Sequence, residues 1–321
     1  MSLFLQQLVN GLTLGSLYAL IAVGYTVVYG IVQLINFAHG EVFMIGAFGA
    51  LATYLLFFKG QTALWILPIM IVGAMLASVG TAVLMERAAY RPLRNAPRLA
   101  PLITAIGISV FLQEFVRLFF DKVPGADFPS AKAKIPFPQI DVVTGPAFTP
   151  GGVSIQRAAI FTIGSLLLAA ALLWYFINKT KVGRGMQAVS QDADTARLMG
   201  INVDRIIVVA FALGAALAAI AGVAQGLLVT NVHFKIGFLA GLKAFTAAVL
   251  GGIGNIWGAV VGGLVLGVLE ALVTQYSRYL PGILGQFGGS TWKDVWAFGL
   301  LILILVFRPQ GLLGAKVVDR A

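Results

Sequence analysis

The chain alternates between long apolar segments and short polar connections. Most apolar segments are continuous runs of about 18 to 27 residues without alternating polar positions, which is typical of helices that cross a lipid bilayer rather than of β-barrel strands. The runs that we expect to cross are 3–29, 42–58, 64–85, 101–120, 157–177, 206–229, 257–273 and 295–307. The pattern predicts an all-α, polytopic membrane protein with about eight transmembrane helices, in a single domain over residues 1–321.

Two stretches interrupt this pattern. The first covers residues 33–41, and the second follows the run 240–250, which is too short to cross and leads into a Gly-Gly-Ile-Gly sequence. Each is either an interfacial turn or irregular backbone within the membrane, which survives only where it is buried in protein or faces water. We expect re-entrant or broken helices here, and discontinuous helices of this kind often line transport sites. The candidate residues of a translocation pathway are Asn36, His39, Glu41, Gly251, Gly252, Gly254 and Glu270.

Several charged side chains in these runs have a structural interpretation as well. His39 and Glu41 are two metal ligands without a third, so we expect no metal site and favour capping of the next helix. Glu270 is a lone acid deep in its run, and it either faces the pathway or bonds a neighbouring helix. We interpret Glu114 and Arg117, three residues apart, as a neutralised pair near the outer surface.

The basic residues predict the topology. Arg87, Arg91, Arg94 and Arg98 lie in one short connection with no acid among them, which indicates the cytoplasmic side. By alternation, the proline-rich loop 121–156 is extracytoplasmic, and the basic tail with Lys316 and Arg320 is cytoplasmic. Three simple spans before the arginine connection would put the N-terminus outside, whereas an additional re-entry near residues 33–41 would put it inside.

The longest polar segment with helical features is GRGMQAVSQDADTARLMGINVDR, residues 183–205. Ser190 or Asp192 can cap a short helix there, and Gly200 is placed as a helix-ending glycine. Ala193, Ala196 and Met199 recur at a spacing of three and predict a small apolar face. The segment is either a docking surface for a partner or an ordinary cytoplasmic loop with a helical turn.

The core of this segment, Asp194-Thr195-Ala196-Arg197-Leu198-Met199-Gly200, resembles the coupling loop of ABC importer permeases, which carries an acidic-small-Ala-x-x-x-Gly pattern. Asp replaces the usual Glu, and Thr replaces the usual Ala. The wider sequence DADTARLMGINVDR, together with residues 34–48 and 241–272, resembles the branched-chain amino acid permeases of ABC importers, of the LivH type. The resemblance covers nearly the whole chain in order.

This resemblance implies an ABC importer permease fold with a coupling loop at residues 179–205. It implies leucine, isoleucine and valine as cargo, and alternating access driven by partners that hydrolyse ATP. Those partners would be two ABC ATPase subunits, a second homologous permease subunit (LivM-type) and a periplasmic substrate-binding protein, at the bacterial inner membrane. The residues expected to couple to the ATPases are Arg184, Asp192, Asp194, Arg197, Gly200 and Asn202.

Composition narrows the function classes. The 321 residues are 59% hydrophobic and only 11% charged, against about 25% charged in soluble domains. The net charge of +10 lies mostly at span ends, which fits lipid headgroups and topology rather than nucleic acid. With no cysteine, two histidines and no nucleotide-binding sequence, we expect neither an enzyme nor a cofactor bound by this chain.

Two other functions remain open at this stage. An ion-coupled secondary carrier or channel for a small polar solute needs acids within the membrane, and only Glu114 and Glu270 qualify. A membrane-embedded structural subunit of another complex is the third alternative.

Overall fold

The computed structural model of the chain describes residues 2–34, 36–94, 96–97, 99–125, 127–279 and 289–314. The helices are α1 (Ser2–Val32), α2 (His39–Phe57), α3 (Ile66–Met85), α4 (Leu99–Phe119), α5 (Arg157–Lys179), α6 (Lys181–Gln191), α7 (Ala193–Leu198), α8 (Val203–Val229), α9 (Ile236–Gly251), α10 (Ile256–Tyr276) and α12 (Lys293–Phe307). A π-helical turn, Glu86–Tyr90, extends α3. Arg98, the predicted outer turn around Pro281, and the basic tail with Lys316 and Arg320 lie outside the described residues.

Within the described residues, seven helices are long and apolar enough to cross a membrane: α1, α2, α3, α4, α5, α8 and α10. The apolar helix α9 has 16 residues and α12 has 15, so each is shorter than a usual span of about 20 residues. The protein is therefore an all-α, multi-pass membrane protein with additional short helices, as the sequence predicts.

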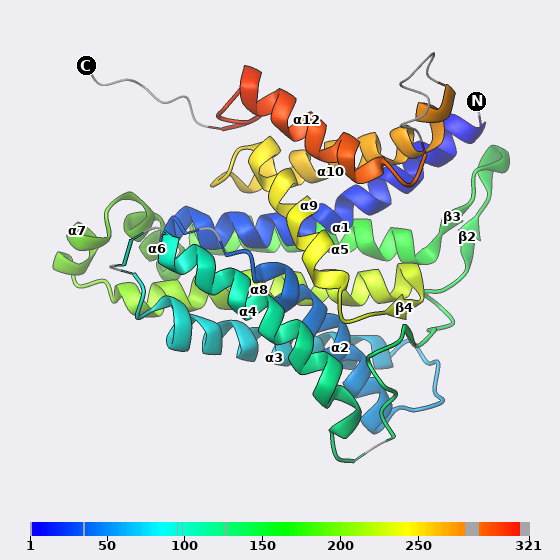
Figure 1. Cartoon of the computed structure of the whole chain (residues 1–321), viewed down its shortest axis with the longest axis horizontal. Helices are drawn as coiled ribbons and strands as arrows, with labels where there is room; N and C mark the ends of the chain where they lie inside the picture. Colours follow the sequence, from blue (N-terminus) through cyan, green and yellow to red (C-terminus); the bar gives the residue numbers. More distant parts are fainter. Residues whose placement is uncertain are drawn as a thin grey trace.

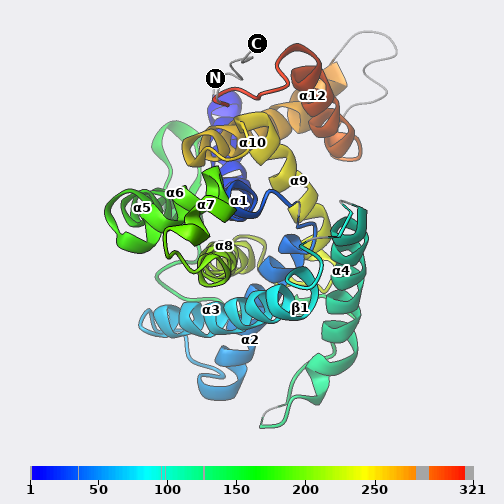
Figure 2. The same cartoon turned by 90° about the vertical axis from the view of Figure 1, so that its left-hand side faces the viewer.

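Helix α1 forms the centre of the bundle. It packs against α10, α8, α9 and α5, which surround it when the molecule is viewed from the α7 end (Figure 2). Small residues bring α1 and α10 into close contact, because a Cβ on Gly267 would lie 2.2 Å from the backbone nitrogen of Gly15. A Cβ on Gly11 would lie 2.6 Å from Cα of Val268. Close approach of backbones replaces the hydrophobic drive that lipid does not provide.

The two ends of the bundle differ. The helices α6 and α7 lie at one end, and the N-terminus lies at the other, with the short strands β2 (Pro146–Phe148) and β3 (Ile155–Gln156) (Figure 1). Strand β1 (Ile135–Pro136) pairs antiparallel with β4 (Asn231–Val232) and so ties the long loop to the connection between α8 and α9. Three helices, α1 to α3, precede the arginine connection, which fits the topology with the N-terminus outside.

Helix α4 stands at the edge of the bundle, where it packs against α2 (Figure 2). Its outward face is apolar, with Ile103 67% exposed and Phe111 63% exposed, as expected of a surface that meets lipid. Near its end, the Arg117 Nε lies 2.6 Å from Oε2 of Glu114, and both side chains are partly exposed. The predicted neutralised pair is therefore present.

Candidate coupling helix and helix-break pocket

The segment that links α5 to α8 folds into two short helices, α6 and α7. Thr180 caps α6, since its Oγ1 accepts a hydrogen bond from the Gly183 backbone nitrogen at 3.0 Å. Gly183 also permits the sharp α5–α6 turn, because a Cβ there would meet the carbonyl oxygens of Phe176 and Ile177 at 2.3 Å. Met186 and Val189 are the buried apolar residues of α6, and Arg184 lies on its exposed side.

Asp192 is the residue that starts α7. Its Oδ1 accepts hydrogen bonds from the backbone nitrogens of Asp194 and Thr195, at 2.9 and 3.0 Å. Its Oδ2 accepts a hydrogen bond from Thr195 Oγ1 at 2.6 Å. These bonds satisfy free amides of the first helical turn and hold the pKa of Asp192 below its ordinary value, because they favour the charged carboxylate. Ser190 is not the cap; its hydroxyl bonds the Gln187 carbonyl.

Helix α7 ends at the predicted glycine. Gly200 adopts φ +83°, a left-handed conformation that glycine reaches without a Cβ clash. The Ile201 backbone nitrogen then donates to the Ala196 carbonyl at 3.1 Å, which closes the helix end. Asn202 caps α8 directly afterwards, with Oδ1 accepting from the Arg205 backbone nitrogen at 3.0 Å.

The tip of α7 exposes apolar surface. Leu198 is 88% exposed and Met199 is 79% exposed, whereas Ala196 is buried. Of the residues of the predicted small apolar face, Ala196 is buried against the bundle, Ala193 is half-buried and Met199 is exposed. Arg197 lies 3.5 Å from Asp194, and both are exposed. Leu198 and Met199 are adjacent, so they place exposed apolar surface beside the charged Arg197 and Asp194.

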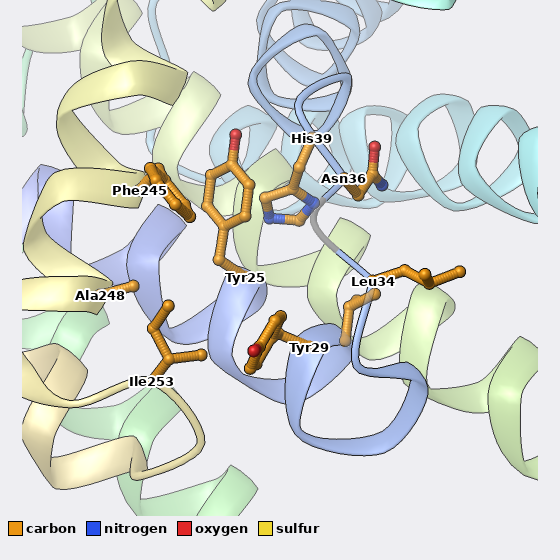
Figure 3. Close-up of a pocket in the computed structure, with 9 residues that line it drawn as sticks. Tyr25, Tyr29, Leu34, Asn36, His39, Phe245, Ala248 and Ile253 are labelled. Atoms are coloured by element: carbon orange, nitrogen blue, oxygen red, sulfur yellow. The ribbon is translucent and has the colours of Figure 1, made fainter. Parts of the chain in front are cut away.

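The two interruptions of the helical pattern meet in one narrow pocket (Figure 3). The first break contributes Leu34, Asn36 and His39, and the connection between α9 and α10 contributes Ile253. The remaining walls come from α1 and α9, through Tyr25, Val28, Tyr29, Phe245 and Ala248. The rings of Tyr25 and His39 pack edge to face with centroids 4.6 Å apart. In this conformation the pocket has room for little more than a water molecule.

The backbone around the second break departs from a helix at the predicted glycines. Gly252 and Gly254 have φ +104° and +96°, and Gly251 packs so closely that a Cβ would lie 1.9 Å from the Gly258 carbonyl oxygen. The free carbonyls of Leu250 and Gly251 accept hydrogen bonds from residues 312 and 313. Gly251 and Gly252 are thus buried in protein, which is the condition for irregular backbone within a membrane, whereas Gly254 is exposed.

Glu41 does not cap α2, so that prediction is wrong. The N-cap of α2 is Ala38, without a side-chain hydrogen bond, and the Glu41 side chain is fully buried against α4. Its Oε1 accepts hydrogen bonds from Ser109 Oγ at 3.0 Å and Gln113 Nε2 at 2.8 Å. Burying a carboxylate costs free energy unless donors reach it, and the donors that reach Glu41 lie on α4 rather than at the start of α2. Among the described residues, Oε2 of Glu41 has no hydrogen-bond partner.

Glu270 bonds neighbouring helices. Its Oε1 lies 2.8 Å from Nζ of Lys243 on α9, and its Oε2 accepts a hydrogen bond from the Tyr18 hydroxyl of α1 at 3.0 Å. Lys243 also lies 2.6 Å from Asp294 at the start of α12. Sequence reasoning missed Lys243, although one lysine inside an apolar run was a detectable signal, because a buried charge requires a partner.

Comparison with known proteins gives a consistent result. Residues 7–305 match the family described as branched-chain amino acid transport system / permease component. The permease protein BraD of a high-affinity branched-chain amino acid transport system in Pseudomonas aeruginosa is 45% identical over 99% of this chain and 98% of that protein. The corresponding LivH protein of Escherichia coli (strain K12) is 42% identical, over 99% of this chain and 97% of that protein.

A solved structure of a metal-chelate type ABC transporter in an inward-facing conformation is 16% identical, with a TM-score of 0.48, and covers 95% of this chain and 87% of that chain. The family match and the two relatives span nearly the full length, from α1 to α12. The chain therefore belongs to the family of branched-chain amino acid transport system permease components.

Proposed function

We propose that this chain is the transmembrane permease subunit of a binding-protein-dependent ABC importer for leucine, isoleucine and valine. The names of its relatives support the cargo and the class of transporter. The observation that carries the proposal is the tip of α7, where Leu198 and Met199 are exposed on a helix held between two membrane spans. An ATPase subunit on the cytoplasmic side can bind such a tip and move it.

The mechanism is alternating access. Two ABC ATPase subunits bind at the α6–α7 end and hydrolyse ATP, which this chain does not do. Closure of the ATPases moves α7 and shifts the helices around the pocket, so that the pocket opens to one side at a time. The residues assigned to the ATPase contact are Arg184, Asp192, Asp194, Arg197, Gly200 and Asn202.

The pocket at the helix breaks supports an aliphatic cargo. Val28, Leu34 and Ile253 provide apolar walls that suit a branched side chain, and Asn36 and His39 provide polar groups on one side (Figure 3). Asn36, His39, Glu41, Gly251, Gly252 and Gly254 belong to this pathway in our proposal. Glu270 does not, because Lys243 and Tyr18 occupy both of its oxygens.

The assembly is completed by a second homologous permease subunit (LivM-type) and a periplasmic substrate-binding protein, in the bacterial inner membrane. We place the binding protein at the end of the bundle that carries β1 to β4, opposite α7 (Figure 1). Surrounding lipid covers the apolar faces of helices such as α4.

The test uses the full complex reconstituted in liposomes, with leucine uptake and ATP hydrolysis measured together. We expect Gly200→Trp and Arg197→Glu to lower leucine uptake at least about tenfold while ATP hydrolysis persists, because the first distorts the end of α7 and the second reverses the charge of its tip. Arg308→Glu is the control, since Arg308 is an exposed arginine outside this segment. Normal uptake in both α7 variants would refute the coupling role.

The alternative of an ion-coupled carrier is tested with the permease alone. Leucine uptake driven by a proton or sodium gradient, without ATPase subunits, would support it. The contacts of the two acids named for this alternative speak against it, since Glu114 pairs with Arg117 and Glu270 pairs with Lys243; the acid that remains is the buried Glu41, whose Oε2 has no hydrogen-bond partner among the described residues. Neither Glu114 nor Glu270 is left free to bind a driving ion.

A further inference from the structure

We infer that two sets of side-chain contacts, Asp204–Arg94–Glu86 and Tyr90–Asn36, joined by the π-helical turn Glu86–Tyr90, carry the movement of α7 to the wall of the pocket at the helix breaks. In this assignment Arg94, Glu86 and Tyr90 are positioning residues for transport, which touch neither the ATPase nor the cargo. The inference rests on the proposed function, and it names the internal link between its two sites. We call this chain of contacts the relay.

The relay begins next to α7. Asn202 caps α8, and Asp204 lies in the first turn of that helix. Only residues 199–202 separate α7 from α8, and the bond from Ile201 to the Ala196 carbonyl holds this connection against α7. A displacement of α7 therefore moves the start of α8 and the Asp204 carboxylate with it.

Arg94 joins the start of α8 to the end of α3. Its Nη1 lies 2.5 Å from Oδ1 of Asp204, and its Nη2 pairs with Oε1 of Glu86. The Glu86 side chain is fully buried and the Arg94 side chain is 20% exposed, so water screens the pair little. A guanidinium is a rigid planar fork, which suits it to hold two carboxylates in fixed positions. The half-exposed side chain of Arg91 also pairs with Asp204.

The π-helical turn Glu86–Tyr90 passes the displacement inward. Glu86 and Tyr90 are its first and last residues, and the Glu86 carbonyl accepts a hydrogen bond from the Arg91 backbone nitrogen. The Tyr90 hydroxyl then donates to Oδ1 of Asn36 at 2.7 Å, with both residues buried. Isolated π-turns are rare and occur frequently at functional sites, where they add local freedom to a helix.

The relay ends at an element that can change shape. Asn36 lines the pocket, and it lies in the break between α1 and α2. Gln33 in the same break has φ +54°, an uncommon conformation for a residue other than glycine. Residues held in sparsely populated backbone conformations cluster at active sites, ligand clamps and switch regions. A pull on Asn36 would therefore move the pocket wall before it deforms a complete helix.

A purely structural role for these contacts predicts different data. If they only hold the fold, their loss lowers thermal stability and reduces ATP hydrolysis and uptake together. If they transmit movement, their loss reduces leucine transported per ATP hydrolysed in a protein that still folds. Spatial continuity alone does not establish coupling, so the ratio of transport to hydrolysis is the decisive measurement.

The experiment uses the complete reconstituted transporter with three variants. Tyr90→Phe removes one hydroxyl, and we expect a fall of about 3- to 10-fold in leucine transported per ATP. Glu86→Gln/Arg94→Gln removes the ion pair without leaving a buried charge, and we expect a fall of about tenfold or more. Arg94→Lys keeps the charge but loses the fork, and we expect an intermediate value.

The matched control is Glu114→Gln/Arg117→Gln, an ion pair on α4 that is connected to neither α7 nor the pocket. It should leave the ratio of transport to hydrolysis unchanged. A double-mutant cycle adds a second readout: Tyr90→Phe combined with Asn36→Ala should be no worse than the more damaging single variant, because both remove one contact.

The outcomes distinguish failure of the relay from failure of the proposed function. An unchanged ratio in Tyr90→Phe and in the Glu86/Arg94 double variant overturns the relay, and so does a parallel loss of ATP hydrolysis, uptake and melting temperature. If those variants couple normally while Gly200→Trp uncouples, the relay is wrong and the role of α7 stands. If Gly200→Trp and Arg197→Glu also couple normally, the proposed coupling role of α7 itself fails.

Discussion

At the scale of single residues, Asp192 decides whether α7 exists as a helix. Its carboxylate accepts three hydrogen bonds from Asp194 and Thr195, and α7 has only six residues. So short a helix has little intrinsic stability, so the cap matters more than it would in a long one.

We therefore predict that Asp192→Ala frays α7 and lowers leucine uptake per ATP, whereas Asp192→Asn keeps both, because asparagine caps as well as aspartate. Limited proteolysis of the α6–α7 segment and the transport ratio measure the two effects. Equal protease resistance in the alanine variant would contradict this view of the cap.

The same residue gives a pH dependence. The pKa of Asp192 is lowered in the folded protein, so its contribution to the stability of α7 is fully present above the unfolded pKa of about 3.9. That contribution is lost as pH falls through the lower folded pKa. Protease sensitivity of α7 in the wild type should therefore be constant near neutral pH.

Sequence reasoning at this scale succeeded where the chemistry is local. Asp192 and Gly200 act on their immediate neighbours in the chain, so the candidate cap and the helix end could be predicted from the local sequence. Glu41 was assigned to its own helix end, but its partners Ser109 and Gln113 lie on α4, which no local pattern indicates. Residues whose partners are distant in sequence need the fold before they can be assigned.

At the scale of elements, the buried charges tie four helices together. Lys243 of α9 contacts Glu270 of α10, Tyr18 of α1 and Asp294 of α12. Helix α9 also packs against α10, α1 and α2, whereas Ala297 is the only buried residue of α12 that the structure describes. The ion pair between Lys243 and Asp294 therefore matters most for the position of α12.

We predict that Lys243→Met lowers stability by about 3–5 kcal/mol, because it leaves the buried Glu270 with only the partly exposed Lys293 as a cationic neighbour. The double variant Lys243→Met/Glu270→Gln should recover part of this loss. Thermal unfolding in detergent measures both. Lys293→Met is the control, since that side chain is 40% exposed and lies 3.4 Å from Glu270, and its effect should be below about 1 kcal/mol. A double variant as unstable as Lys243→Met would contradict this account.

The spans themselves were predictable, because each long apolar run is a sufficient signal for a helix in lipid. The contact between the two helix breaks was not. Residues 33–41 and 251–254 were singled out separately, and nothing in their sequences says that Asn36 and Ile253 line the same pocket. That proximity depends on how α1, α9 and α10 pack.

At the scale of the whole molecule, the two ends of the bundle have different proposed partners: the binding protein at the end with the strands, and the ATPase subunits at the end with α6 and α7. The N-terminus lies at the end with β2 and β3, and α7 lies at the other (Figure 1). The chain has no cysteine, so single-cysteine variants report on topology without a background. We predict that Ser2→Cys and Thr149→Cys react with a membrane-impermeant thiol reagent from outside, and that Met199→Cys reacts only in inside-out vesicles. Labelling of Met199→Cys in intact cells would remove the basis for a cytoplasmic partner.

The close contact between α1 and α10 has a consequence for biosynthesis. The ribosome delivers α1 to the membrane first, but Gly263 and Gly267, which cover its glycine face, are translated near the end. Until then, only lipid or a chaperone can contact the glycine face of α1, and lipid does not match its shape as α10 does. Nascent chains interrupted before residue 256 should remain loosely assembled and become substrates for membrane proteases. The permease is thus committed to its final shape only when synthesis is almost complete.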